Sequence, residues 1–281
     1  MRIPYETSRT ALFSPERMPT IFVTGTDYDD ATLCAEASRL AYIRFNEDEP
    51  EQQRLARSLA LVGFNDVNVR SEAGTQVVVA CDVDKKRTLV IFRGTQPDDI
   101  SDITTDADFW RCVWRGGGSV HRGFAAAYDS IHGWLDEQVK GIAPIQMLIT
   151  GHSLGAALAT LAASIYPSAH LYTFGSPRVG DGEFADSFVS RTVVRFVNCA
   201  DLVTRIPPEP MGYQHVGTER YIDRSGTLRL TMDAVQKFED AAIARVEYIA
   251  SSAWRPGSVA VRDLADHAPI NYVSGVMGSR S

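Results

Sequence analysis

The sequence predicts one domain of the α/β class over residues 1–281, with a mostly parallel central sheet and helices on both faces. From residue 145 onward, short apolar runs of strand length alternate with helical patterns. Strands that are apolar throughout are typical of a parallel sheet buried on both sides. Hydrophobic residues make up 44% of the chain, and we find no repeat and no Pro/Gly/Ser-rich linker that would divide it.

The first half of the chain contains three helical patterns and two short β-rich runs. Apolar side chains recur at helical spacing in residues 29–44 and 49–61, and again in 122–139. Residues 76–80 and 88–92 are rich in β-branched side chains, and a charged turn separates them. This arrangement indicates a β-hairpin.

In the second half of the chain, expected strands alternate with expected helices. The expected strands are 145–150, 171–174 and 193–198, followed by a late hairpin strand at 215–222. The expected helices are 156–165, 183–189 and a long one at about 231–250.

The strongest local motif is GHSLG at 151–155, a G-x-S-x-G pattern. An apolar strand runs directly into it and an Ala-rich helix leaves it, which is the setting of a nucleophile elbow. Any Cβ at Gly151 or Gly155 would collide with the neighbouring strand or helix. The N-terminus of the helix also presents backbone N–H groups to negative charge developing on a substrate oxygen. The plain alternative is that Ser153 only caps this helix.

A serine nucleophile needs a base, and three of the six histidines follow Ser153 in the chain. His170 precedes a strand, at the wrong end of the sheet to meet the elbow. His215 opens an expected strand, where a half-buried, hydrogen-bonded histidine is the simpler interpretation. His267 lies in a late, loop-like segment that can fold back over the sheet edge, and we favour it as the base.

The base needs a carboxylate partner that follows a later strand. Asp201 lies just after the 193–198 strand, at the edge where ligands gather in such sheets. Asp181 is the competitor, but its sequence indicates a turn into the next helix with the aspartate as cap. We therefore favour Asp201.

Two backbone turns can supply an oxyanion hole. The strand at 88–92 ends in Arg93-Gly94-Thr95, where Thr95 can offer a backbone N–H and a hydroxyl. The second donor is the N–H of Leu154, the residue after the nucleophile.

Several blocks of this sequence resemble the class 3 lipase family of α/β hydrolases. They are FRGT at 92–95, HRGF at 121–124, GHSLGAALA at 151–159, TFGSPRVG at 173–180 and DLVTRIPP at 201–208, with Asp266-His267 near the end. The resemblance implies an α/β-hydrolase fold and a lipase or esterase that cleaves acyl esters of lipids. It assigns the nucleophile to Ser153, the carboxylate to Asp201, the base to His267 and the oxyanion hole to Thr95 and Leu154.

Two segments depart from that family. Lipases that act at oil surfaces usually carry an amphipathic lid helix after the Phe-Arg-Gly block, but here residues 96–106 begin acidic and carry few large apolar side chains. We expect at most a short lid, with Phe109, Trp110, Val113 and Trp114 packed beneath it or lining the pocket, and little interfacial activation. Residues 228–261 are expected to form a helical insertion or cap; of the roles that this segment can have, we favour a plain core helix over a cap or a partner-binding helix.

The expected reaction uses the three side chains alone, without a metal or organic cofactor. A phospholipase A-type enzyme or an acyltransferase with the same residues is the alternative within this chemistry. A non-catalytic binding protein with the same fold is the alternative outside it.

Composition and charge exclude several classes of binding partner. The formal net charge is −7, which gives no attraction to nucleic acid or to an anionic membrane, although transient contact with a lipid–water interface fits the substrate class. No apolar stretch reaches the ~20 residues of a membrane-spanning helix, and no signal peptide is visible, which predicts a cytoplasmic protein or export by a leaderless route. The four cysteines are scattered, as expected for reduced thiols, and nothing in the sequence specifies an oligomeric state.

Overall fold

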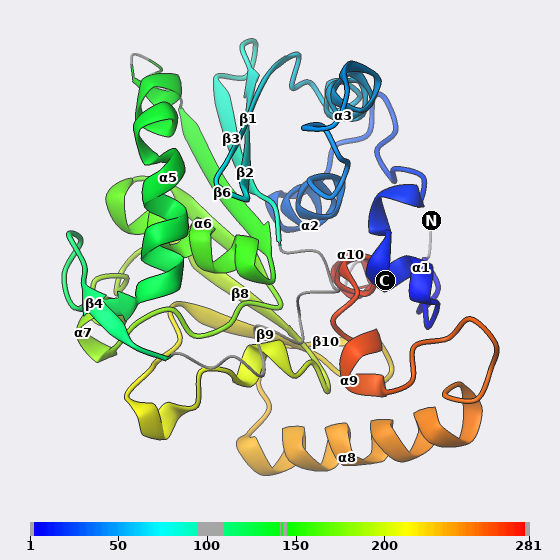
Figure 1. Ribbon diagram of the computed structural model, residues 1–281. Coiled ribbons are helices and arrows are strands. Elements are labelled where there is room, and N and C mark those ends of the chain that lie inside the picture. Colours follow the sequence, from blue (N-terminus) through cyan, green and yellow to red (C-terminus); the bar gives the residue numbers. More distant parts are fainter. Residues whose placement is uncertain (1–2, 95–108, 141, 143–144, 279–281) are drawn as a thin grey trace.

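The computed structural model describes residues 3–94, 109–140, 142 and 145–278, and shows the α/β-hydrolase fold, with an eight-stranded sheet between layers of helices (Figure 1). The strand order is β1-β2-β3-β6-β7-β8-β9-β10. The strands are β1 (Asp66–Glu72), β2 (Thr75–Asp82), β3 (Arg87–Phe92), β6 (Gln146–His152), β7 (His170–Phe174), β8 (Val193–Asn198), β9 (Thr218–Ile222) and β10 (Leu228–Arg229). A separate ribbon pairs β4 (Arg111–Val113) with β5 (Ser119–His121).

The five strands from β3 to β9 run parallel, and antiparallel strands extend the sheet at both edges. The register aligns Phe92 of β3 with Gly151 of β6, and His152 of β6 with Phe174 of β7. These strand ends therefore lie along one edge of the sheet, where the chain leaves each strand for the loops of the site.

Each face of the sheet carries its own layer of helices, and alternate strand residues serve the two layers. Val78 and Ala80 pack with α2 (Asp30–Leu40) and α10 (Pro269–Gly278), whereas Val77 and Val79 pack with α5 (Arg122–Val139) and α6 (Leu154–Ile165). The period of two in a strand explains this division. The remaining helices are α1 (Arg9–Phe13), η1 (Pro15–Arg17), α3 (Glu49–Ala60), α7 (Gly182–Asp186), η3 (Val203–Arg205), η4 (Glu209–Met211), α8 (Ala234–Ser251) and α9 (Arg262–Ala265).

Most expected elements are present, with shifted ends. The hairpin and the helix at 122–139 are confirmed, but α2 ends at Leu40, α7 ends at Asp186 and α6 already begins at Leu154. Strand β1 was not expected from the sequence, because it is an edge strand whose mostly polar residues form no buried run. His215 does not open the late strand, because β9 begins at Thr218 and pairs parallel with β8 before its antiparallel turn to β10.

The expectation of a core helix in residues 228–261 is wrong. Its Phe238, Ile243, Val246 and Ile249 all point to solvent on α8, and the buried side of this helix is formed by other residues. Of the residues expected to pack beneath the lid or line the pocket, Trp114 is buried in the core on the α5 and α6 side, while Trp110 and Val113 are exposed around β4. The proposed lid at 96–106 lies outside the described residues. No helix in the described part of the chain is both long and apolar enough to span a bilayer.

Candidate active site

Ser153 occupies a sharp turn between β6 and α6. Its backbone has φ 58° and ψ −128°, a conformation that costs energy for any residue with a side chain. The turn is possible because a Cβ at Gly151 would lie 2.3 Å from the carbonyl of Gly155, and a Cβ at Gly155 would lie 2.2 Å from the carbonyl oxygen of Phe92. Both glycines are therefore required by the close approach of β6, α6 and β3, as the sequence predicted.

The structure brings the three predicted side chains together. Nε2 of His267 lies 2.9 Å from Oγ of Ser153, and Nδ1 of the same ring lies 2.8 Å from Oδ2 of Asp201. All three residues are buried. Because a carboxylate can only accept a hydrogen bond, Nδ1 carries the proton and Nε2 accepts from the serine hydroxyl. This arrangement can move a proton from the hydroxyl to the ring.

The Asp201 carboxylate is held from two further directions. The backbone N–H of Val203 donates to Oδ1 over 2.9 Å, and the hydroxyl of Tyr272 donates to Oδ2 over 2.5 Å. The Tyr272 hydroxyl in turn accepts from the N–H of Asn198. Burial raises the pKa of Tyr272 well above its ordinary value, so the phenol remains a donor. The carboxylate is thereby fixed in the orientation that faces His267.

A second buried histidine holds the backbone of His267. Nε2 of His152 lies 2.8 Å from the carbonyl oxygen of His267, and Nδ1 lies 2.8 Å from the hydroxyl of Tyr42. A carbonyl only accepts, so Nε2 carries the proton and the tyrosine donates to Nδ1. Burial lowers the pKa of His152 well below its usual value, and the ring stays neutral.

A third network joins the loops that carry Asp201 and His267. Asp266 accepts from the N–H of Ala200 over 2.9 Å, and its backbone carbonyl accepts from the side chain of Asn198. Its other carboxylate oxygen accepts from Arg262 and from the hydroxyl of Tyr5, each over 2.7 Å. Burial raises the pKa of the Asp266 carboxyl, an effect that Arg262 opposes. The two loops therefore hold each other in place.

The supporting roles of these residues were not predicted from the sequence. The available signal was position alone: Asp266 directly precedes His267, and His152 directly precedes Ser153. No pattern in the sequence indicated Tyr272 or Tyr42, because each reaches the site through folding.

The predicted oxyanion residues are described in part. Leu154 is the first residue of α6, so its backbone N–H belongs to the unpaired first turn of that helix. Thr95 lies outside the described residues. Gly94 before it packs tightly on the elbow, because a Cβ there would lie 2.6 Å from the carbonyl oxygen of His152.

Two of the rejected candidates, His215 and Asp181, have structural roles. His215 is half-buried, with Nε2 2.8 Å from the carbonyl oxygen of Thr204, and burial lowers its pKa well below the usual value. Asp181 caps α7 by accepting from the N–H of Phe184. Neither bonds to Ser153 or His267 in the described contacts.

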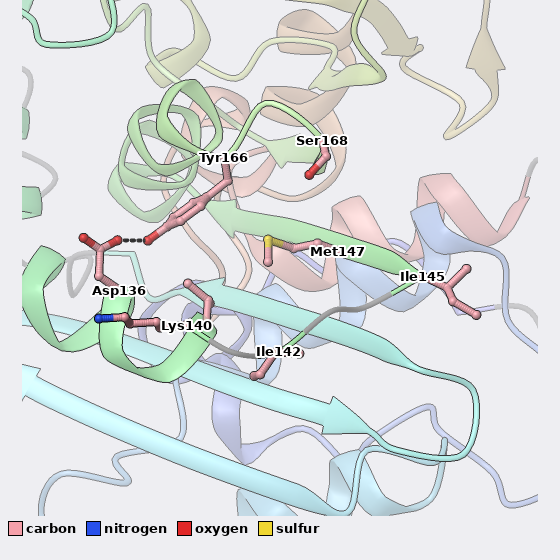
Figure 2. Close-up of a pocket in the computed structure, with 8 residues that line it drawn as sticks. Asp136, Lys140, Ile142, Ile145, Met147, Tyr166 and Ser168 are labelled. Carbon is pink, nitrogen blue, oxygen red and sulfur yellow. Dashed lines mark hydrogen bonds between the residues drawn. The ribbon is translucent and has the colours of Figure 1, made fainter.

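A separate hollow lies at the opposite end of β6. Figure 2 shows this pocket between the end of α5, the start of β6 and the end of α6. Its volume is about 610 Å³. Met147 and Ile145 line it, and the hydroxyl of Tyr166 donates to Asp136 at its side. It holds none of the predicted residues, since Ser153 follows the other end of the strand, about 20 Å away at 3.3 Å per residue. The described residues also contain no group of three or more His, Cys, Asp or Glu side chains placed to bind a metal ion.

Comparison with known proteins agrees with the geometry. The family described as Lipase (class 3) matches residues 89–211. The chain is 32% identical over 168 residues to a secreted mono- and diacylglycerol lipase of Fusarium solani, which covers 55% of this chain and 50% of the relative. It is 34% identical over 165 residues to a lipase of Rhizomucor miehei, covering 53% and 45%.

A solved structure of the Rhizomucor miehei triacylglyceride lipase is also similar. It aligns with a TM-score of 0.52 and 27% identity, over 69% of this chain and 77% of that one. The chain spans about half the length of the curated relatives named above.

Proposed function

Because this chain belongs to the class 3 lipase family, we propose that it hydrolyses the carboxylic ester bonds of lipids through an acyl-serine intermediate. The relatives are named as lipases of mono-, di- and triacylglycerols, and acylglycerols are the substrate class that we propose here. The single observation that carries the proposal is the hydrogen-bonded series Ser153–His267–Asp201 at a strained strand-to-helix turn.

In the first half of the reaction, Oγ of Ser153 attacks the ester carbonyl carbon while its proton passes to Nε2 of His267. Asp201 accepts from Nδ1–H, which keeps the ring in the required tautomer and stabilises its positive charge. The N–H of Leu154, with Thr95, holds the negative charge on the carbonyl oxygen, where one donor contributes about 10²–10³ in rate. The imidazolium then gives its proton to the leaving alcohol.

The second half repeats these steps with water. His267 removes a proton from the water as its oxygen attacks the acyl carbon, and then returns that proton to Oγ of Ser153. The products are a fatty acid and the regenerated enzyme. This series of steps is supported by the position of a single nitrogen, Nε2 of His267, which faces the hydroxyl that must lose and regain the proton.

The test is Ser153→Ala with a water-soluble p-nitrophenyl ester as substrate. We expect turnover to fall by a factor on the order of 10⁶, because the nucleophile is removed. Ser187→Ala is the matched control, since Ser187 is exposed and its hydroxyl donates only to the carbonyl of Phe184 in the described contacts.

A fluorophosphonate probe gives an independent readout. It should label the wild-type chain at Ser153 and leave Ser153→Ala unlabelled. A Ser153→Ala variant with activity within tenfold of wild type, or a wild-type chain that the probe does not label, would contradict the proposal.

A further inference from the structure

Helix α8 turns its apolar side to solvent. Large apolar side chains recur along it at positions 235, 238, 246 and 249, spacings that place them on one helix face. Val235, Phe238, Val246, Ile249 and the following Trp254 are each 65–70% exposed. We call these five residues the α8 face. Elsewhere on the described surface, Val83 and Val189 are exposed far from each other in the chain, and Trp110 and Val113 are exposed at β4.

The opposite side of α8 explains this orientation. Asp240 is buried and accepts hydrogen bonds from Sγ of Cys199, the hydroxyl of Tyr221 and both the backbone and the guanidinium of Arg224. Ala241 and Ala244 pack beside it against the ends of β8 and β9. Because this carboxylate has its partners only on the sheet side, the helix cannot rotate to bury its larger apolar side chains.

The helix also lies next to the candidate active site. Cys199 and Ala200, which α8 covers, directly precede Asp201. In Figure 1, α9 lies between α8 and α10, and His267 is in the short connection between α9 and α10. Arg245 of α8 pairs with Asp263 of α9 over 2.7 Å. The α8 face therefore belongs to a helix fixed to both loops of the site.

We propose that the α8 face binds the surface of a neutral acylglycerol droplet and so brings the enzyme to its substrate. This inference rests on the proposed lipid-ester activity. It assigns surface attachment to α8, whereas lipases of the family that act at oil surfaces are expected to use the segment after the Phe-Arg-Gly block.

The charges of the molecule favour a neutral surface. The five side chains of the α8 face are uncharged. Arg245 and Lys237 of the same helix are already paired with Asp263 and Glu219. Two exposed charged residues next to the face, Glu239 and Arg255, are of opposite sign. The whole chain carries a net charge of −7 and is repelled by an anionic membrane. Attachment therefore depends on apolar contact alone.

The area of the face argues against a second copy of this chain as the occupant. A helix of 18 residues is about 27 Å long and about 10 Å wide, so its face covers on the order of 300 Å², whereas a stable dimer buries about 800 Å² per partner. A lipid surface sets no such threshold, because each inserted side chain contributes separately.

The experiment measures flotation of the full chain with triolein droplets coated with phosphatidylcholine. The chain carries Ser153→Ala, so that the lipid is not consumed. We expect it to float with the droplets, and expect Phe238→Ser with Val246→Ser to lower the bound-to-free ratio about tenfold or more, since two large apolar contacts are lost. Val83→Ser with Val189→Ser is the matched control, because both valines are exposed away from α8, and it should float unchanged.

Three results would overturn the proposal. One is equal flotation of the α8 double variant and its parent. Another is stronger binding to phosphatidylglycerol vesicles than to the droplets. The third is a dimer, seen by light scattering, that becomes a monomer in the α8 double variant.

Activity measurements separate this inference from the proposed function. With Ser153 intact, the α8 double variant should keep the wild-type rate on a soluble p-nitrophenyl ester and lose about tenfold on the triolein emulsion. A wild-type chain inactive on both substrates would contradict the proposed function, while flotation would still decide the role of α8.

Discussion

Helices α6 and α8 both adjoin the candidate active site, but α6 buries its apolar residues in the protein whereas α8 exposes its large apolar side chains to solvent. In α6, nine of the 12 residues are buried, whereas in α8 only four of the 18 are. Helix α6 is apolar nearly all round, so apolar side chains would face the sheet at any rotation of the helix about its axis. Helix α8 has one apolar stripe and one buried aspartate, and the aspartate determines which side faces the protein. Apolar content alone therefore does not predict the direction in which a helix faces.

The largest expected effect comes from a substitution in α6, the more deeply buried of the two helices. Gly155→Ala places a methyl group 2.2 Å from the carbonyl oxygen of Phe92, which neither backbone can avoid. We expect at least a 10²-fold loss of esterase activity and a lower melting temperature, because the elbow must open to fit the group. A p-nitrophenyl ester assay measures the activity, and thermal unfolding measures the melting temperature.

Gly133→Ala is the control for this change, since nothing lies within 4 Å of a Cβ at that position in α5. It should stabilise the protein by about 0.8–1.0 kcal/mol, through helix propensity alone. A Gly155→Ala variant with the stability and activity of Gly133→Ala would contradict the packing described here.

Acid offers a test that does not involve α8, because this helix contains no histidine, whereas His152 at the end of β6 and His215 before β9 are largely shielded from solvent. Burial lowers the pKa of both rings. Below about pH 6.5 the unfolded chain gains protons that the folded chain does not, so stability falls as pH falls, by up to about 1.4 kcal/mol per pH unit for each ring.

The measurement is denaturant unfolding at pH 6.0, 5.5 and 5.0. His215→Gln keeps a donor for the carbonyl of Thr204 and should remove about 1 kcal/mol per pH unit from the slope. Equal slopes for this variant and wild type would show that His215 does not resist protonation in the folded state.

The anchor of α8 can be tested by Asp240→Asn. The amide cannot accept all the hydrogen bonds that the carboxylate receives from Cys199, Tyr221 and Arg224, so we expect a loss of about 2–3 kcal/mol in the free energy of unfolding. Glu239→Gln, one position away and exposed, should change it by less than 0.5 kcal/mol. If both variants unfold alike, the carboxylate is not what orients the helix.

The smallest expected effect concerns the orientation of Asp201. Tyr272→Phe removes one hydrogen bond to the carboxylate and leaves the ring in place, which we expect to lower kcat/KM about tenfold and to shift the acid limb of its pH profile upward. The shift arises because a carboxylate with one donor fewer attracts the positive charge on His267 more strongly. A purely structural role would lower stability without moving that limb.

Tyr248→Phe is the control for Tyr272→Phe, because Tyr248 is also buried and donates to a backbone carbonyl, that of Val259. It should leave the pH profile unchanged. An equal shift in both variants would contradict a specific effect on the carboxylate.

Much of the site was predictable because the turn at Ser153 is built from residues that are consecutive in the sequence. The glycines around Ser153, the strand before it and the helix after it are consecutive in the sequence, and their steric demands can be read without the fold. The choice of His267 and Asp201 depended on chain order and on the edge where parallel strands end. Tyr272 and His152 could not be assigned, because their partners are 71 and 115 residues away.

The sequence by itself determined the class of the fold, the order of its main elements and the sharp turn at Ser153, because hydrophobic periodicity and glycine sterics act over a few residues. Only the tertiary structure decided which side of α8 faces outward and which polar groups hold Asp201 and His267 in place. Those outcomes depend on buried carboxylates finding donors from distant segments, and the cost of leaving such a group unpaired outweighs the exposure of a few apolar side chains.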